Sequence, residues 1–243
     1  MSRFYVTKES VLGDSIVIGG EEAHHIIDVM RIKPSDSIVA FDGSGREYAG
    51  LIEKIARRSV TVKILRTIEP SAPPGVGITL IQSLPKKAKM DYIVEKATEL
   101  GAAAVVPVIT ERTIPDWDED KRASCALRWR RIALEASKQC GRRDIPAVSG
   151  IAPFAAVLKA AGGYDLALIA TLADGAAPLR EALKGFSAGR IAVAIGPEGD
   201  FTPKEAELAR EAGFRPVTLG SRVLKSDTAG LAVLAILEYE LSG

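Results

Sequence analysis

Hydrophobic and polar residues follow two different patterns along this chain, and the pattern changes near residue 70. Before that point, short segments at 15–18, 37–41 and 60–64 alternate apolar and polar residues, as half-buried strands do. Asp42-Gly43-Ser44-Gly45 has the composition of a hairpin turn, and one short helix is expected at Glu21 to Met30. We therefore expect a small, mostly β domain, in the form of a barrel.

After residue 76, apolar strand-like runs alternate with longer helical patterns. Such alternation is typical of a mainly parallel sheet covered by helices on both faces. Thr202-Pro203-Lys204-Glu205 is a capping box with proline at the first helical position, and it predicts the start of a helix. The predicted strands lie at 77–84, 104–109, 165–170, 190–195 and 216–219, and the other predicted helices at 87–100, 121–139, 154–161 and 178–183.

The segment from Pro70 to Gly75 separates the two patterns. It holds three prolines and one glycine in six residues, a composition that suits a stiff, exposed linker. We therefore place a domain boundary there, with one domain at residues 1–70 and the other at residues 76–243.

The final predicted helix, Thr228 to Leu241, has almost no polar face in its first half. A helix that is apolar all round is expected to be buried on all sides. Its sequence suits an oligomer interface as well as it suits a central core helix.

Composition and charge narrow the class of protein without identifying a partner. Of the 243 residues, 47% are hydrophobic and 26% are charged, as in globular proteins. The formal net charge is +1, so any affinity for nucleic acid must come from local basic patches. The longest apolar run, around Leu231 to Leu237, is far too short to span a bilayer.

Cys125 and Cys140 are the only cysteines. On one helix their 15-residue separation would place them roughly 22 Å apart, which rules out an internal disulfide. Two thiols and an N-terminus without a signal-peptide pattern lead us to expect a cytoplasmic protein. The adjacent His24 and His25 point to different helix faces and no Cys or acidic set has ligand spacing, so we expect no metal site.

Two glycine-bearing loops follow predicted strands, at Ile195 to Phe201 and at Leu219 to Ala229. Ligands of open α/β sheets usually bind beyond the carboxyl ends of the strands. The run from Gly196 to Gly199 differs from the dinucleotide pattern G-x-G-x-x-G, Pro197 lacks an amide donor, and Glu198 would repel a phosphate. The loops therefore favour a ligand without phosphates, such as a nucleoside.

Together the two loops carry a recognisable pattern, Ile195-Gly196-Pro197-Glu198-Gly199-Asp200-Phe201 followed by Leu219-Gly220-Ser221-Arg222-Val223-Leu224-Lys225-Ser226-Asp227-Thr228-Ala229. This pair closely resembles the motifs of the bacterial 16S ribosomal RNA uridine-N3 methyltransferases, members of the SPOUT superfamily. The resemblance covers nearly the whole chain, with further similar segments at His24 to Arg31, Glu95 to Gly101 and Trp129 to Arg142. Three positions depart from the family's usual pattern: Asp200 stands where glycine is common, Lys225 where arginine is common, and Asp227 where glutamate is common.

The resemblance implies a fold and an activity. The fold would be an N-terminal PUA-like β-barrel that helps hold RNA, followed by an α/β domain whose last segments form a deep trefoil knot. The activity would be S-adenosyl-L-methionine-dependent methylation of N3 of a decoding-region uridine in 16S rRNA of the small ribosomal subunit. The resemblance also implies a homodimer formed through the knotted region.

Site residues follow from the same resemblance together with the chemistry of uracil. Negative charge develops on the base during methyl transfer to N3, and a fixed cation stabilises it. Arg222 is the first candidate for this cation and Lys225 the second. Glu198 and Asp227 are candidates for the base that removes the N3 proton, although helix capping is the better expectation for Asp227. The residues expected around the cofactor are Thr171, Ile195, Gly196, Gly199, Leu219, Gly220 and Leu224.

Basic residues that could contact RNA phosphates occur in several clusters, and a solvated helix face balanced by Glu135 is an equal explanation for any single one of them. Three functions remain in view. They are the uridine-N3 methyltransferase, another SPOUT enzyme such as a ribose 2′-O methyltransferase, and a catalytically silent RNA-binding or ribosome-assembly protein. The candidate RNA-binding residues are Arg31, Lys33, Lys86, Lys87, Lys89, Arg128, Arg130, Arg131, Arg142 and Arg143.

Overall fold

The computed structural model describes residues 2–70, 75–86, 89–114, 117–173 and 175–241, and these divide into two compact units. The first unit contains the residues up to 70 together with Ser137–Ile145. The second contains residues 75–136 and those from Pro146 onwards. The predicted boundary at Pro70 to Gly75 stays a prediction, because residues 71–74 lie outside the described part.

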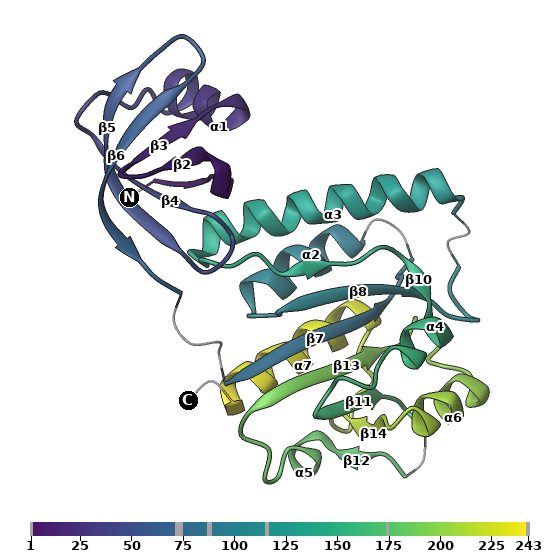
Figure 1. The fold of residues 1–243 in the computed structure, drawn as a ribbon. Helices are drawn as coiled ribbons and strands as arrows, with labels where there is room; N and C mark the ends of the chain where they lie inside the picture. Colours follow the sequence, from purple (N-terminus) through teal and green to yellow (C-terminus); the bar gives the residue numbers. More distant parts are fainter. Residues whose placement is uncertain (1, 71–74, 87–88, 115–116, 174, 242–243) are drawn as a thin grey trace. The chain divides into compact units, whose positions relative to one another are not determined.

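The first unit is built on a six-stranded sheet (Figure 1). Its strands run in the order β1-β4-β5-β6-β3-β2, with β1 parallel to β4 and the other pairs antiparallel. Side chains such as Phe4, Ile18 and Ile38 form the core of this unit. The strands are β1 (Arg3–Tyr5), β2 (Val11–Leu12), β3 (Ser15–Ile18), β4 (Ser37–Phe41), β5 (Glu47–Ile55) and β6 (Val60–Ile68).

The predicted turn at Asp42 to Gly45 joins β4 to β5 and is held by its own aspartate. Asp42 Oδ1 accepts hydrogen bonds from the Ser44 amide at 2.9 Å and the Ser44 hydroxyl at 2.6 Å. Burial raises the pKa of Asp42, but these bonds and one from the Tyr48 hydroxyl outweigh it and hold the pKa below its ordinary value. The predicted helix at 21–30 is α1 (Gly20–His24) followed by one π-helical segment, η2 (His25–Val29).

The second unit contains an eight-stranded sheet in which every pair of neighbouring strands is parallel. The order β10-β8-β7-β13-β11-β14-β12 places β13 between β7 and β11, and β9 also pairs with β8. The strands are β7 (Val76–Ser83), β8 (Ala104–Ile109), β9 (Ala147–Val148), β10 (Ala152–Pro153), β11 (Leu166–Ala170), β12 (Ala177–Pro178), β13 (Gly189–Ile195) and β14 (Arg215–Thr218).

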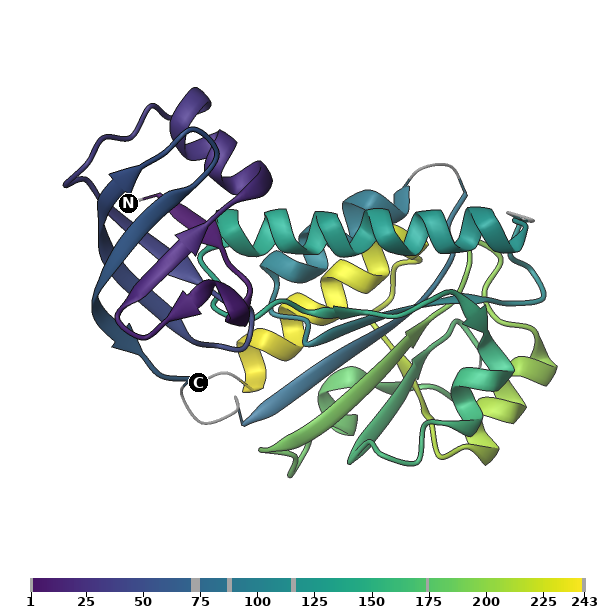
Figure 2. The same ribbon diagram turned by 45° about the horizontal axis from the view of Figure 1, so that its top comes forward.

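Helices cover both faces of this sheet, as the alternating pattern predicts (Figures 1 and 2). On one face, α4 (Phe154–Lys159) and α6 (Pro203–Glu211) pack on residues such as Ile81 and Ala192. On the other face lie α2 (Lys89–Glu99), the part of α3 (Glu119–Cys140) that belongs to this unit, and α7 (Ser226–Leu241). A short helix, α5 (Leu179–Ala182), follows β12.

The expectation that the last helix is buried on all sides is wrong for the chain by itself. Gly230, Val233, Leu234 and Leu237 of α7 are buried, but Ala235 and Ile236 in the same apolar stretch are exposed, and Tyr239 beyond it is 85% exposed. The other face of α7 therefore remains apolar and open in the single chain. No helix within the described residues is long and apolar enough to cross a membrane.

Candidate functional site

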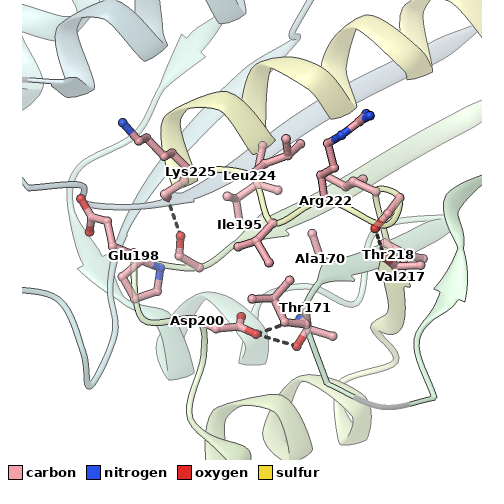
Figure 3. A pocket seen from close by; sticks show the side chains of 18 residues that line it. Ala170, Thr171, Ile195, Glu198, Asp200, Val217, Thr218, Arg222, Leu224 and Lys225 are labelled. Carbon is pink, nitrogen blue, oxygen red and sulfur yellow. Dashed lines mark hydrogen bonds between the residues drawn. The ribbon is translucent and has the colours of Figure 1, made fainter.

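A cavity lies where the carboxyl ends of β11, β13 and β14 meet (Figure 3). This is the edge at which parallel sheets usually bind ligands. Its walls are mainly apolar side chains and glycine backbone, with two carboxylates on the β13–α6 loop and two cations on the β14–α7 loop. The lining residues are Ala170, Thr171, Leu172, Ile195, Gly196, Pro197, Glu198, Asp200, Val217, Thr218, Leu219, Gly220, Arg222, Val223, Leu224, Lys225, Ser226 and Ala229.

The structure brings together most of the residues that the sequence nominates for this site. Of the seven expected around the cofactor, Gly199 is absent from the lining set; Thr171, Ile195, Gly196, Leu219, Gly220 and Leu224 are in it. Gly199 serves the loop itself, because its carbonyl accepts a hydrogen bond from the Arg112 guanidinium. The three candidate catalytic residues, Arg222, Lys225 and Glu198, all line the cavity.

The β13–α6 loop is anchored in the core of the unit. Phe201 is 5% exposed and stacks on Phe154 of α4, with ring centroids 4.8 Å apart. The predicted capping box is present: the Glu205 amide donates to the Thr202 hydroxyl at 3.2 Å, and the Glu205 carboxylate accepts from the Thr202 amide at 2.9 Å. The start of α6 therefore fixes the end of the loop.

Gly196 is required for the tight path of this loop. A Cβ atom at this position would lie 3.2 Å from both the amide nitrogen and the ring of Phe201. Because the backbone of residue 201 is held by the buried ring and the following cap, it has little room to move. The glycine thus leaves space where the loop turns over the end of β13.

Glu198 ties the loop to the strand at the other side of β13. Its Oε1 accepts a hydrogen bond from the backbone amide of Lys86, which follows β7, at 3.0 Å. The carboxylate is at the exposed end of the cavity wall. Glu198 therefore lines the site and also connects two neighbouring strand ends.

A buried polar chain connects α7 to the same loop. Gln82 Nε2 donates to the Ser226 hydroxyl at 2.9 Å and to the Ser83 carbonyl at 3.0 Å, and the Ser226 hydroxyl donates to the Gly196 carbonyl at 2.5 Å. Gly230 allows this approach, because a Cβ atom there would lie 2.6 Å from Gln82 Oε1. The first turn of α7 is thus fixed against β7 and the start of the β13–α6 loop.

The β14–α7 loop is much more open. Arg222, Val223 and Lys225 are exposed, and within the described part of the chain neither Arg222 nor Lys225 has a side-chain hydrogen bond or ion pair. Figure 3 shows both cationic side chains extending from this loop away from Asp200. Asp227 lies in the first turn of α7, and its carboxylate accepts from Lys89 Nζ at 3.0 Å, which forms an ion pair.

The candidate RNA-binding cations that the structure describes do not line the cavity, and several have acidic neighbours. Lys89 pairs with Asp227 and Arg128 with Asp91 in the second unit. In the first unit, Arg142 Nη2 lies 2.6 Å from Asp144 Oδ2, and Arg143 Nε lies 4.0 Å from Glu47 Oε2. Arg130 Nε donates to the Val148 carbonyl, and Arg131 is also not without a partner. Lys87 lies outside the described residues.

Lys86, Arg31 and Lys33 differ from these cations. Lys86 is exposed, and its side chain has no partner among the residues that the structure describes. Arg31 of the first unit is also exposed, and its side chain has no partner among the described residues. Its backbone φ is 52°. The backbone amide of Lys33 donates a hydrogen bond to Asp36 Oδ2 at 2.8 Å, and the ammonium group of Lys33 takes no part in this bond. Among the described residues, no three His, Cys, Asp or Glu side chains gather as a metal site would require.

Three lining or supporting residues have roles that the sequence does not predict. Asp200 is noticed only as a departure from the family pattern, and Ser226 and Gln82 are not nominated at all. A signal was present for Gln82, because an amide side chain inside a mainly apolar strand must find a buried partner. Its partner is 144 residues away in the chain, a separation that local periodicity does not report.

Two sequence families match the chain. One is described as an RNA methyltransferase domain and covers residues 72–238, and the other as an RNA methyltransferase PUA domain and covers residues 18–65. The Bacillus subtilis protein named ribosomal RNA small subunit methyltransferase E is 28% identical over 251 aligned residues, covering 99% of this chain and 97% of that protein. The Synechocystis protein of the same name is 32% identical over 235 residues, covering 96% of this chain and 76% of that protein.

A solved structure is similar over the same length. It is a ribosomal RNA small subunit methyltransferase E from Neisseria gonorrhoeae bound to S-adenosyl methionine. It aligns with a TM-score of 0.86 and 31% identity, over 99% of this chain and 98% of that chain. The similarity therefore includes both units, and not the strand-end loops alone.

Proposed function

We propose, from the premise that this chain belongs to the RNA methyltransferase family, that it methylates N3 of a decoding-region uridine in 16S rRNA of the small ribosomal subunit, with S-adenosylmethionine as methyl donor. The observation that carries the proposal is the cavity at the ends of β11, β13 and β14. It joins a tightly anchored loop that bears carboxylates to an open loop that bears two cations.

The cavity fits the proposed cofactor in its chemistry. S-adenosylmethionine has an adenosine but no phosphate, and it supplies a methyl group on a cationic sulfur. Apolar walls at Ile195, Val217 and Leu224 suit a nucleoside, and the backbone at Gly196 and Leu219 offers hydrogen-bonding edges. The carboxylate of Glu198, which would oppose a phosphate, is compatible with a cationic ligand.

The cations of the β14–α7 loop are suited to the other reactant. Uracil N3 must lose its proton before it can form a bond to carbon, and the negative charge then spreads over N3, O2 and O4. Arg222 and Lys225 have no partner within the described residues, so their charge is available to such an anion. Arg222 is the first candidate because its planar guanidinium can donate two parallel hydrogen bonds.

The two candidate bases differ in their surroundings. Asp227 pairs with Lys89 and is not a lining residue, whereas Glu198 is exposed at the wall of the cavity. Glu198 is therefore the better placed of the two to accept the N3 proton. Positioning of the two reactants in one cavity would supply a further part of the rate.

RNA would be held by cations outside the cavity. Lys86 is the first candidate in the second unit, since its side chain is exposed and its amide contacts Glu198 of the cavity wall. Lys89, Arg128 and Arg131 would contribute from the same unit, and Arg31, Arg142 and Arg143 from the first unit. Contacts of this type to phosphates make binding depend on salt.

A homodimer through the C-terminal region would cover the open face of α7. Ile236 and Tyr239 of this helix and Tyr92 of α2, which packs against α7, are exposed large apolar side chains. Replacement of Tyr239 by glutamate should place a charge in such an interface and shift the protein towards the monomer. Sedimentation velocity measures this, and an unchanged sedimentation coefficient would argue against this face.

The direct test of the proposed function is the identity of the methylated nucleoside. Small ribosomal subunits that lack the modification are incubated with the protein and S-adenosylmethionine, and the RNA is digested and measured by mass spectrometry. The expected product is 3-methyluridine. A 2′-O-methylated nucleoside would assign the chain to a different SPOUT activity, and no product together with no cofactor binding in calorimetry would indicate a silent RNA-binding protein.

A further inference from the structure

Asp200 has an unusual backbone conformation in the anchored loop. Its φ of 60° lies in the left-handed region, which few residues other than glycine adopt, although aspartate tolerates it. Its amide donates to the Pro197 carbonyl at 3.0 Å and closes a turn. The turn thereby directs a carboxylate into the wall of the cavity, where glycine would leave only backbone.

Both oxygens of this carboxylate are used. Oδ2 accepts from the Thr171 hydroxyl at 3.0 Å and from the Leu172 amide at 2.9 Å. Oδ1 accepts from the Phe201 amide at 2.8 Å. Bonds between a carboxylate and backbone amides are charge-assisted and stronger than neutral ones. One side chain therefore joins the end of β11 to the loop that follows β13 (Figure 3).

Thr171 extends this connection to a third strand. Its amide donates to the Val217 carbonyl of β14 at 3.1 Å, and its hydroxyl accepts from the Ala173 amide at 3.2 Å while donating to Asp200. Thr171, Leu172 and Asp200 all line the cavity. The segments that Asp200 holds together are thus the walls of the site itself.

We propose that Asp200 is a positioning residue that sets the shape of the cofactor pocket by clamping the end of β11 to the β13–α6 loop. The inference rests on the proposed function for the identity of the ligand. The clamp acts through the backbone of Thr171 and Leu172 and not through contact between the Asp200 charge and the ligand. It therefore affects a cationic and an uncharged ligand of the same shape equally.

The test compares two ligands and two substitutions. Asp200→Gly accepts the positive φ without strain, so it removes the clamp alone. Calorimetry should show that this variant binds S-adenosylmethionine and the product S-adenosylhomocysteine, whose sulfur carries no charge, each about tenfold more weakly than the wild type. Asp200→Asn retains one acceptor oxygen, so its affinity for each ligand should lie between that of the wild type and that of Asp200→Gly.

Asp165 provides a matched control at the opposite end of the same two strands. Its Oδ2 accepts from the Arg190 amide at 2.7 Å, so it also joins β11 to β13, but six residues and roughly 20 Å from Thr171. Asp165→Gly should leave the affinity for both ligands unchanged. A loss of affinity in Asp165→Gly equal to that in Asp200→Gly would show general loosening of the sheet and would overturn the proposal.

Hydrogen exchange of the free protein tests the clamp without any ligand. The Leu172 and Phe201 amides should exchange about tenfold faster in Asp200→Gly than in the wild type, because they lose their acceptor. Unchanged exchange with unchanged affinity would overturn the proposal. So would a loss confined to S-adenosylmethionine, which would indicate a direct contact between charges. If the wild type binds neither ligand, the proposed function fails, while the exchange rates still decide the clamp.

Discussion

The two loops that form the site differ in how firmly the rest of the molecule holds them. The β13–α6 loop is fixed by Phe201 in the core, by the Thr202 cap, and by side-chain bonds to the segments after β7, β8 and β11. The β14–α7 loop exposes Arg222, Val223 and Lys225, and within it the Thr218 hydroxyl donates to the Gly220 carbonyl.

This difference suggests a division of work between the loops. A cofactor pocket benefits from walls that need no ordering when the ligand binds, because ordering costs affinity. A cation that must meet a large RNA substrate benefits from exposure. We infer that the anchored loop gives the cofactor pocket its rigid wall, which Leu219, Gly220 and Leu224 of the open loop complete, and that the exposed cations of the open loop supply the charge for transfer.

The largest expected effect is on transfer when the open loop loses its first cation. Arg222→Ala should lower the rate of methyl transfer by about 10²- to 10³-fold, the usual result of removing one preorganised group that stabilises developing charge. Single-turnover assays at saturating cofactor measure it. Arg180→Ala, which removes an exposed arginine of α5 away from the cavity, is the matched control and should react at the wild-type rate.

The next largest effect is expected on cofactor binding when a side chain is added in the tightly packed anchored loop. Gly196→Ala would place a methyl group 3.2 Å from the Phe201 amide nitrogen and ring, and the loop would have to shift. Overpacking of this kind costs about 1–3 kcal/mol, so affinity for S-adenosylmethionine should fall by about 5- to 150-fold. Calorimetry gives the dissociation constant. Wild-type affinity would mean that the loop is not as rigid as its contacts indicate.

A smaller effect is expected where α7 is fixed to the anchored loop. Ser226→Ala removes the donor to the Gly196 carbonyl and one acceptor of Gln82, and buried groups without partners cost about 1–3 kcal/mol. Cofactor affinity should fall by about tenfold, and Ser226→Thr should restore most of it because the hydroxyl remains. If threonine fails to rescue, the position matters for its size and not for the hydrogen bond.

The smallest effect tests the RNA surface next to the anchored loop. Lys86→Ala removes an exposed charge while leaving the amide that binds Glu198. Binding of small-subunit RNA should weaken severalfold, and the slope of log K against log salt should fall by about one. Cofactor affinity should not change. A change in cofactor affinity would show that the side chain acts on the pocket.

Local patterns in the sequence predict the framework of the site well. The strand at 104–109 has the predicted ends, and the capping box at Thr202 is present, because both depend on neighbours within a few residues. Short strands such as β9 and β12 are missed, since two residues carry no periodic signal. The strand β5, which pairs with both β4 and β6, is predicted only as the strand that must follow the hairpin turn, and its bounds are not predicted.

The clamp and the buried polar chain could not be predicted in this way. Asp200 and Thr171 are 29 residues apart, and Gln82 and Ser226 are 144 apart, so their contacts depend on the order of strands in the sheet. The open face of α7 has the same cause. The apolar pattern of α7 predicts that its surface is buried, but it does not tell which face packs within this chain and which face is left for a partner.

Calorimetric titration of Arg222→Ala and Gly196→Ala with S-adenosylmethionine, side by side, tests the division of work most directly. We predict that Arg222→Ala binds the cofactor within about threefold of the wild type, because the cation is placed for the base and not for the adenosine. Gly196→Ala should bind at least about fivefold more weakly. Loss of binding in Arg222→Ala together with wild-type binding in Gly196→Ala would contradict the account.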